Sequence, residues 1–143
     1  MAQQRKTGKR LSSGAVVVRE SGGGLRFLLL RAFDHWDFPK GIVEDGEEPL
    51  AAAQREIEEE TTLCDLEFAW GETFIETGPY SRGKTARYYI ARTFCANIEL
   101  PVNPELGRAE HSEYRWVDYD EAIRLTSPRV RPVLQWAANV MNL

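Results

Sequence analysis

Residues 55–60 read Arg-Glu-Ile-Glu-Glu-Glu, and they place four glutamates in the last turns of an expected helix. Pro49 suits the first turn of that helix, because its missing N–H costs nothing there, and the helix is expected to end near Thr61. The C-terminal end of a helix carries about half a negative charge, so each carboxylate there is disfavoured by roughly 0.3–1 kcal/mol. Acid concentrated at this end therefore favours a bound cation.

The helical period separates these glutamates into two groups. At about 100° per residue, the stripe expected to face the core consists of Leu50, Ala53 and Ile57. Three carboxylates related by three and four positions share another side, and these are Glu56, Glu59 and Glu60. Glu58 projects away from them. Hard cations such as Mg²⁺ take oxygen ligands and bind phosphate oxygens at the same time, so the trio predicts a divalent-metal site. The alternative is a solvated acidic face, which is how most charge runs turn out.

The segment upstream extends the pattern into a long signature. Gly41 lies six residues before Glu47, and Glu47 lies eight before Arg55, which completes G-x5-E-x7-R-E-(apolar)-x-E-E. On these residues the chain resembles the Nudix hydrolase family. The matching positions are Gly41, Glu47, Arg55, Glu56, Ile57, Glu59, Glu60 and Leu63. The signature's last glycine is replaced by Thr62. A β-branched residue disfavours the left-handed conformation of a helix stop by roughly 1–2 kcal/mol, so we expect the usual stop to be lost and the metal ligands to be kept.

Segments outside the signature resemble one group of Nudix enzymes, the asymmetric bis(5'-nucleosyl)-tetraphosphatases. These segments are 27–30, 35–41, 110–111 and 114–116. The resemblance implies Mg²⁺-dependent hydrolysis of a pyrophosphate linkage in a nucleoside polyphosphate, most simply diadenosine tetraphosphate to ATP and AMP. The alternatives are an RNA 5'-pyrophosphohydrolase, a (d)NTP pyrophosphatase, a diphosphoinositol polyphosphate phosphohydrolase, or a Nudix module that binds a nucleotide without turnover. Modules of the last kind usually lose signature glutamates, whereas this chain keeps them.

The resemblance also implies roles for individual residues. The expected metal ligands are the backbone carbonyl of Gly41 and the carboxylates of Glu56, Glu59 and Glu60. The expected ion is Mg²⁺, with Mn²⁺ as an acceptable substitute. Arg55 is expected to brace the carboxylates through charge-assisted bonds. A general base is also required, for which Glu110 is the first candidate and Glu59 or Glu60 the second. A plain surface acid is the alternative for Glu110.

Four further residues are candidates for substrate binding. Lys40 stands beside the signature and is expected to meet a phosphate. Tyr80 matches a tyrosine that stacks on adenine in the resembled hydrolases, and such stacking contributes ~1–3 kcal/mol per base. Arg82 and Lys84 are expected to hold the outer phosphates. The alternatives are a solvated lysine and, for the loop that contains the other three residues, a polar hairpin tip.

The order of expected elements predicts an α/β fold with a mixed sheet between helices. Strands are expected at 12–19, 25–33, within 66–75, 84–96 and 113–117, with helices at 49–61, 120–125 and 128–141 and loops at 34–41 and 101–113. Pro132 is a second candidate for the start of the last helix. The family implies an α/β/α sandwich. We expect one Nudix domain at 12–143, preceded by a flexible basic tail at 1–11.

Composition restricts the partners of this chain. Its 143 residues suit one domain, and 43% hydrophobic with 28% charged residues is typical of a soluble globular protein. No apolar run approaches the ~20 residues that span a bilayer, and the N-terminus lacks a signal peptide's apolar region, so a cytoplasmic protein without a membrane partner is expected. The net charge of -4 disfavours a stable nucleic-acid partner. A small nucleotide is the expected partner, and no oligomeric state is indicated. Cys64 and Cys95 are expected to be reduced, buried thiols.

Overall fold

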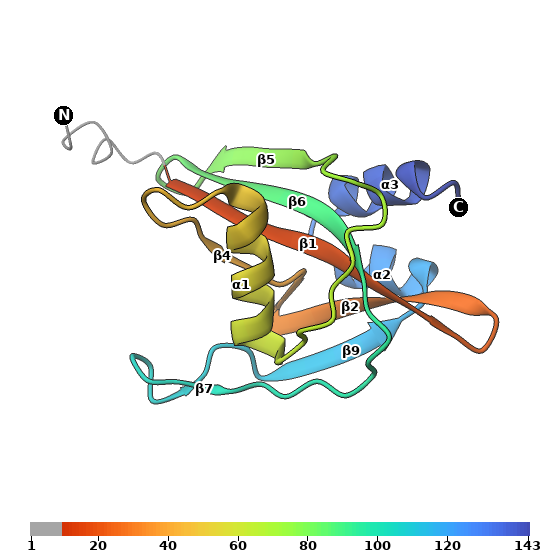
Figure 1. Cartoon of the computed structure of the whole chain (residues 1–143), viewed down its shortest axis with the longest axis horizontal. Helices are drawn as coiled ribbons and strands as arrows, with labels where there is room; N and C mark the ends of the chain where they lie inside the picture. The colour runs from red at the N-terminus through yellow and green to blue at the C-terminus, as the bar shows by residue number, and fades with distance from the viewer. Residues whose placement is uncertain (1–9) are drawn as a thin grey trace.

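The computed structural model describes residues 10–143, and a mixed β-sheet forms its centre (Figure 1). The strands are β1 (Arg10–Ser21), β2 (Gly24–Ala32), β3 (His35–Asp37), β4 (Lys40–Ile42), β5 (Ile75–Tyr80), β6 (Lys84–Arg92), β7 (Val102–Asn103), β8 (Arg108–Ala109) and β9 (Glu113–Val117). The helices are α1 (Pro49–Thr61), α2 (Tyr119–Leu125) and α3 (Arg131–Val140). The main sheet has the order β3-β2-β1-β6-β5, with β4 paired to β1 and β9 to β2. β1 runs parallel to β6 and antiparallel to β2 and β4.

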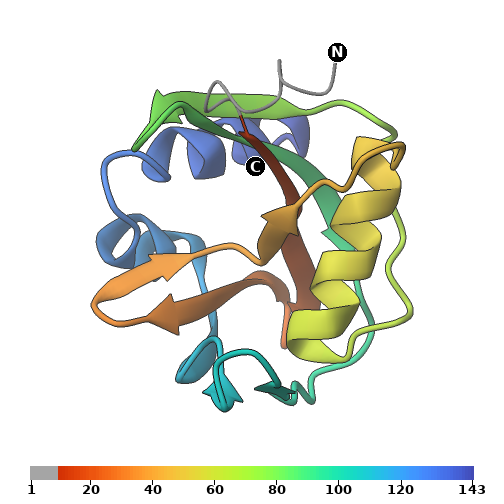
Figure 2. The same cartoon turned by 90° about the vertical axis from the view of Figure 1, so that its left-hand side faces the viewer.

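Helices cover both faces of this sheet. Figure 2 shows α1 on one side and α2 with α3 on the other. Successive side chains of a strand point to opposite faces, and β1 follows this rule. Ala15 and Val17 pack in the cluster that contains Ile57 of α1, whereas Val16 and Val18 pack in the cluster that contains Leu134 of α3. Burying such an aliphatic side chain stabilises the fold by about 1.5–3 kcal/mol. The predicted α/β/α sandwich is confirmed.

Several predicted elements differ from those observed. The loop expected at 34–41 contains β3 and β4, the loop at 101–113 contains the β7–β8 hairpin, and β1 begins at Arg10 inside the expected tail. Residues 1–9 of that tail lie outside the described residues. The last helix begins at Arg131, with Pro132 in its first turn, as the second candidate start predicted.

The strand expected within residues 66–75 is largely absent from the described chain. Only Glu67 forms an isolated bridge there, and β5 begins at Ile75. Leu66 and Phe68 pack against the cluster under α1, whereas Trp70 packs against the cluster on the opposite face. The segment therefore passes around the edge of the sheet, and its apolar alternation reflects packing on two faces rather than strand pairing.

The end of α1 corrects another expectation. Thr62 adopts the left-handed conformation with φ 66° and ψ 5°, and its backbone N–H donates to the carbonyl of Glu58. The helix stop is thus present without glycine, because the chain keeps this conformation despite the cost of a β-branched side chain.

The expectation that Cys64 and Cys95 are buried was wrong. Cys64 and Cys95 are both exposed free thiols, since they lie in the irregular segments that follow α1 and β6. No helix within residues 10–143 is long and apolar enough to cross a membrane.

Candidate active site

The site begins where β4 meets α1. Gly41 has no side chain, and the carboxylate of Glu56 occupies the space that one would fill: a Cβ on Gly41 would stand 1.9 Å from Glu56 Oε1 and 2.0 Å from its Cδ. Glycine at this position therefore lets a carboxylate lie directly against the backbone of β4. The pKa of Glu56 is raised, chiefly by burial, although Arg55 opposes the shift.

Arg55 joins the signature loop to α1. Its Nε and Nη2 donate to the two carboxylate oxygens of Glu47 at 2.7 and 2.9 Å, and Nη1 donates to Glu56 Oε2 at 2.9 Å. Nη1 also reaches both oxygens of Glu59 at 3.3–3.4 Å, and Nη2 donates to the carbonyl of Ile42 at 3.1 Å. Hydrogen bonds from Arg55 lower the pKa of Glu47 to about 2. The bracing role expected for Arg55 agrees with these contacts.

Glu60 is the most enclosed carboxylate of the site. The residue is 8% exposed, and its Oε1 has no hydrogen-bond partner among the described residues. Its pKa is raised well above the ordinary value, first by burial and then by the charges of Glu110 and Glu56. His111 Nδ1 stands 4.0 Å away, which is too far for a hydrogen bond, and burial lowers the pKa of His111.

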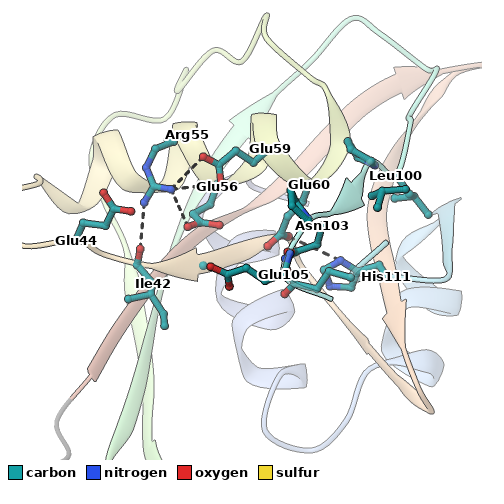
Figure 3. Close-up of a pocket in the computed structure, with 15 residues that line it drawn as sticks. Ile42, Glu44, Arg55, Glu56, Glu59, Glu60, Leu100, Asn103, Glu105 and His111 are labelled. Atoms are coloured by element: carbon teal, nitrogen blue, oxygen red, sulfur yellow. Dashed lines mark hydrogen bonds and ion pairs between the residues drawn. The ribbon is translucent and has the colours of Figure 1, made fainter. Parts of the chain in front are cut away.

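These side chains line a groove of about 730 Å³ (Figure 3). One wall is acidic and is formed by the glutamates of α1, while the facing wall is the segment 100–111. Glu110 also lines the groove, and, in addition to burial, its charge raises the pKa of Glu56 and of Glu60. The facing wall is partly apolar, with contributions from Leu100, Pro101, Val102 and Pro104.

The donor set fits a hard divalent cation. A buried carboxylate oxygen without a partner and a second carboxylate against a glycine backbone are oxygen donors that an ion would satisfy. Within residues 10–143, however, no three His, Cys, Asp or Glu side chains form a ready metal cage. Glu59 is not enclosed with the other carboxylates of the trio: its side chain is 60% exposed and lies 3.3 Å from Arg55 Nη1. The trio thus shares one side of α1, as predicted, without converging on one point, and Glu58 is exposed.

The four residues expected to bind substrate occupy two places. Lys40 directly precedes Gly41, and its Nζ lies 3.6 Å from Asp37 Oδ2. Tyr80, Arg82 and Lys84 lie at the turn between β5 and β6, and none of them is among the described residues that line the groove. Arg82 is exposed with φ 63°, and Lys84 is exposed, so both cations face solvent.

Sequence reasoning missed a polar cluster beside Lys40. Asp37 accepts hydrogen bonds from Arg129 Nη2 at 2.8 Å and from the hydroxyl of Tyr88 at 3.0 Å. The pKa of Tyr88 is raised well above the ordinary value, first by burial and then by the charge of Asp37. Asp37 and Arg129 are 92 residues apart in the chain, and no local sequence pattern predicts that they form a pair.

Comparison with known proteins agrees with this geometry. The NUDIX domain family matches residues 8–137, and the chain belongs to the Nudix hydrolase family. It is similar to the asymmetrical bis(5'-nucleosyl)-tetraphosphatases of Caenorhabditis elegans and Mus musculus. The worm enzyme is 31% identical over 120 residues, which cover 80% of this chain and 83% of the relative. The mouse enzyme is 36% identical over 116 residues, covering 77% and 76%.

A solved structure supports the same relationship. The binary complex of a C. elegans Ap4A hydrolase superposes with a TM-score of 0.76 at 25% identity, covering 94% of this chain and 99% of that chain. Nudix hydrolases generally use divalent metal ions, and the oxygen-rich groove fits such an ion.

Proposed function

We propose that this protein hydrolyses a nucleoside polyphosphate with the help of Mg²⁺, most simply diadenosine tetraphosphate to ATP and AMP. The observation that carries the proposal is the buried, unpartnered Oε1 of Glu60 in a groove that also contains Glu56 and Gly41. The similarity to two tetraphosphatases supports the substrate class. A small nucleotide is then the partner, and the cytoplasm is the proposed location.

The metal would be held by oxygen donors around the end of β4 and α1. These are the carbonyl of Gly41 and the carboxylates of Glu56, Glu59 and Glu60. When bound, Mg²⁺, or Mn²⁺ in its place, neutralises phosphate charge and lowers the pKa of an attacking water. Arg55 keeps Glu56 in place by a contact of 2.9 Å, whereas its contacts with the exposed Glu59 side chain are 3.3–3.4 Å long. Such long, solvated contacts are weak, so Glu59 is free to reorient.

Glu110 is the proposed general base. It lies on the groove wall that faces α1, and its charge acts on Glu56, Glu60 and His111. A base in this position takes the proton of the water that attacks phosphorus. Glu59 is the second candidate, with Glu60 less suited because its burial leaves it little access to solvent.

Substrate recognition is proposed for the basic and aromatic residues outside the acidic groove. Lys40 would contact a phosphate next to the metal, and Tyr80 would stack on adenine at the end of β5. Arg82 and Lys84, at the β5–β6 turn, would bind the outer phosphates. A polyphosphate would then extend from the acidic groove past Lys40 towards β5.

An RNA 5'-pyrophosphohydrolase is the second candidate function. An RNA pyrophosphohydrolase of Bartonella henselae is 25% identical over 133 residues, which cover 78% of this chain. The same carboxylates would serve the reaction, and the difference would lie in the residues that meet the base.

A substrate panel with two matched variants tests the proposal. Purified protein is assayed with dinucleoside polyphosphates, nucleoside triphosphates and 5'-triphosphorylated RNA, in Mg²⁺ and in EDTA. Glu59→Gln is expected to lower kcat on the preferred substrate by roughly 10²–10⁴-fold. Glu58→Gln makes the same charge change at the neighbouring exposed position and is expected to leave kcat unchanged. If the protein hydrolyses no substrate in the panel, the enzyme assignment is refuted. If Glu59→Gln and Glu58→Gln change kcat equally, the proposed role of Glu59 is refuted.

A further inference from the structure

Arg129 lies on the connection between α2 and α3 and joins three strands of the sheet. Its Nη2 donates to Asp37 of β3 at 2.8 Å, and its Nη1 donates to Thr77 of β5 at 3.0 Å and reaches the hydroxyl of Tyr88 of β6 at 3.5 Å. Both terminal nitrogens therefore have partners, and the guanidinium is held in one orientation.

The same guanidinium covers one face of Tyr80. The central carbon of the Arg129 guanidinium stands 4.3 Å from the centroid of the tyrosine ring. Tyr80 is half-buried at the end of β5, where the pairing with β6 is irregular between Thr77 and Tyr80. Arg129 thus covers one face of a ring that also packs against the core cluster, so a base that stacks on Tyr80 has to use the face opposite the guanidinium.

Asp37 connects this ring to the catalytic groove. One of its oxygens, Oδ2, receives Arg129 Nη2 at 2.8 Å and lies 3.6 Å from Lys40 Nζ. Lys40 in turn acts electrostatically on Glu60 and on His111. Lys40 and Tyr80, which are the proposed phosphate and base contacts, are therefore positioned through one shared carboxylate.

We infer that Arg129 is a positioning residue for base recognition: it fixes the Tyr80 ring so that the face opposite the guanidinium stacks on the base of the bound nucleotide. The inference rests on the proposed role of Tyr80 in substrate binding. Arg129 itself is not expected to contact phosphate, because its guanidinium already contacts Asp37, Thr77 and the Tyr80 ring. An arginine fork over an aromatic face contributes through its planar shape, which lysine does not reproduce.

A double-mutant cycle tests the inference without depending on turnover. The dissociation constant of a non-hydrolysable, methylene-bridged analogue of diadenosine tetraphosphate is measured calorimetrically in Mg²⁺. The proteins compared are wild type, Arg129→Ala, Tyr80→Ala and the double variant. Arg129→Ala is expected to weaken binding roughly 3- to 30-fold, the range of a partly desolvated cation–π contact. In the Tyr80→Ala background the same change is expected to have no further effect.

Inorganic tripolyphosphate is the control ligand, because it has phosphates and no base. Its dissociation constant is expected to be the same in wild type and in Arg129→Ala. An equal loss of analogue binding in the Tyr80→Ala background, or a weakened affinity for tripolyphosphate, would overturn the inference. The latter result would show that Arg129 acts on the phosphates, either directly or through Asp37 and Lys40.

Arg129→Lys covers the case in which the alanine variant does not fold. It keeps a cation for Asp37 and is expected to weaken analogue binding in the same direction with unchanged tripolyphosphate binding. Wild-type affinity in this variant would contradict the role of the guanidinium. The result is separate from the test of function: Tyr80-dependent binding without hydrolysis would refute the enzyme assignment alone. Hydrolysis with binding that does not depend on Tyr80 would refute this inference alone.

Discussion

At the residue scale, the Glu56 carboxyl group occupies the space that a side chain on Gly41 would need. A Cβ on Gly41 would stand within 2.6 Å of every atom of the Glu56 carboxyl group. Gly14 on β1 is equally close to a neighbour, but there the neighbour is the backbone carbonyl of Pro39 at 2.0 Å. One glycine therefore makes room for a movable side chain, and the other makes room for a strand.

This difference predicts opposite outcomes for two alanine substitutions. Gly41→Ala is expected to displace the Glu56 carboxylate and lower kcat by roughly 10²-fold, because about 1 Å of misplacement has that effect on catalysis. Its melting temperature is expected to stay close to wild type. Gly14→Ala is expected to lower the free energy of unfolding by about 1–3 kcal/mol, since strand backbone must move. Thermal unfolding and initial rates are measured for both variants. A fully active Gly41→Ala enzyme would refute the proposed place of Glu56 in the active site.

The enclosed carboxylate of Glu60 predicts a metal-dependent stability. A cation present at 100 times its dissociation constant stabilises the folded protein by about 2.7 kcal/mol, so Mg²⁺ is expected to raise the melting temperature relative to EDTA. Glu60→Gln is expected to lose most of that increase and to melt no lower than wild type in EDTA, because it removes a buried charge. Glu58→Gln is the control and should keep the increase. An unchanged Mg²⁺ effect in Glu60→Gln would exclude Glu60 as a ligand.

At the element scale, α1 contributes most of the acidic residues of the candidate site, and the residue that follows it, Thr62, adopts a conformation that its side chain disfavours. Thr62 holds φ 66° where glycine costs nothing. Thr62→Gly is expected to raise the free energy of unfolding by up to ~1 kcal/mol, which is the relief of left-handed strain less the greater entropy of glycine in the unfolded chain. Activity should not change. Chemical denaturation measures the gain in the free energy of unfolding. Thr62→Ala keeps the Cβ and should show little gain. Equal stability of the Thr62→Gly variant and wild type would show that Thr62 is not strained.

The Arg55–Glu47 contact joins the signature loop to α1 and predicts a pH dependence of stability. The pKa of Glu47 in the folded protein, about 2, lies below its ordinary value of 4.5. Glu47 therefore stabilises the folded state above about pH 4.5, and this contribution disappears as the pH falls towards 2. Glu47→Gln is expected to be less stable than wild type at pH 7, with a difference that shrinks below pH 4.5. Urea unfolding at several pH values tests this; a difference independent of pH would refute the ion pair.

The sequence predicts an element correctly where local residues determine its limits, and less well where tertiary contacts do. The 3.6-residue period and Pro49 defined α1 correctly, because helix limits are local. The period also placed Glu56, Glu59 and Glu60 on one side. It did not reveal that Glu59 is exposed and turned to Arg55 whereas Glu60 is buried, because that depends on side-chain contacts. The strand expected within residues 66–75 is largely absent, because apolar side chains that pack on two faces alternate along the sequence as those of a strand do.

At the scale of the whole molecule, the sheet brings distant residues to one end of the site. The parallel pairing of β1 with β6 places Gly14 opposite Tyr88, and β4 pairs with β1 at the same glycine. Lys40 thereby becomes a neighbour of the polar cluster of Asp37, Tyr88 and Arg129, although Asp37 and Arg129 are 92 residues apart. The acidic residues of the candidate site lie within one compact signature, so the sequence alone predicts them. The polar cluster depends on tertiary pairing, and the sequence therefore does not predict the place of Arg129.

The proposed asymmetric hydrolysis of a nucleoside polyphosphate is tested by incubating the protein with diadenosine tetraphosphate in ¹⁸O-labelled water. Cleavage is expected to depend on Mg²⁺ and to form equal amounts of ATP and AMP. One ¹⁸O atom should be incorporated per cleavage, and the product that carries the label identifies the attacked phosphorus. Formation of two molecules of ADP, or no cleavage in Mg²⁺, would refute the proposed reaction.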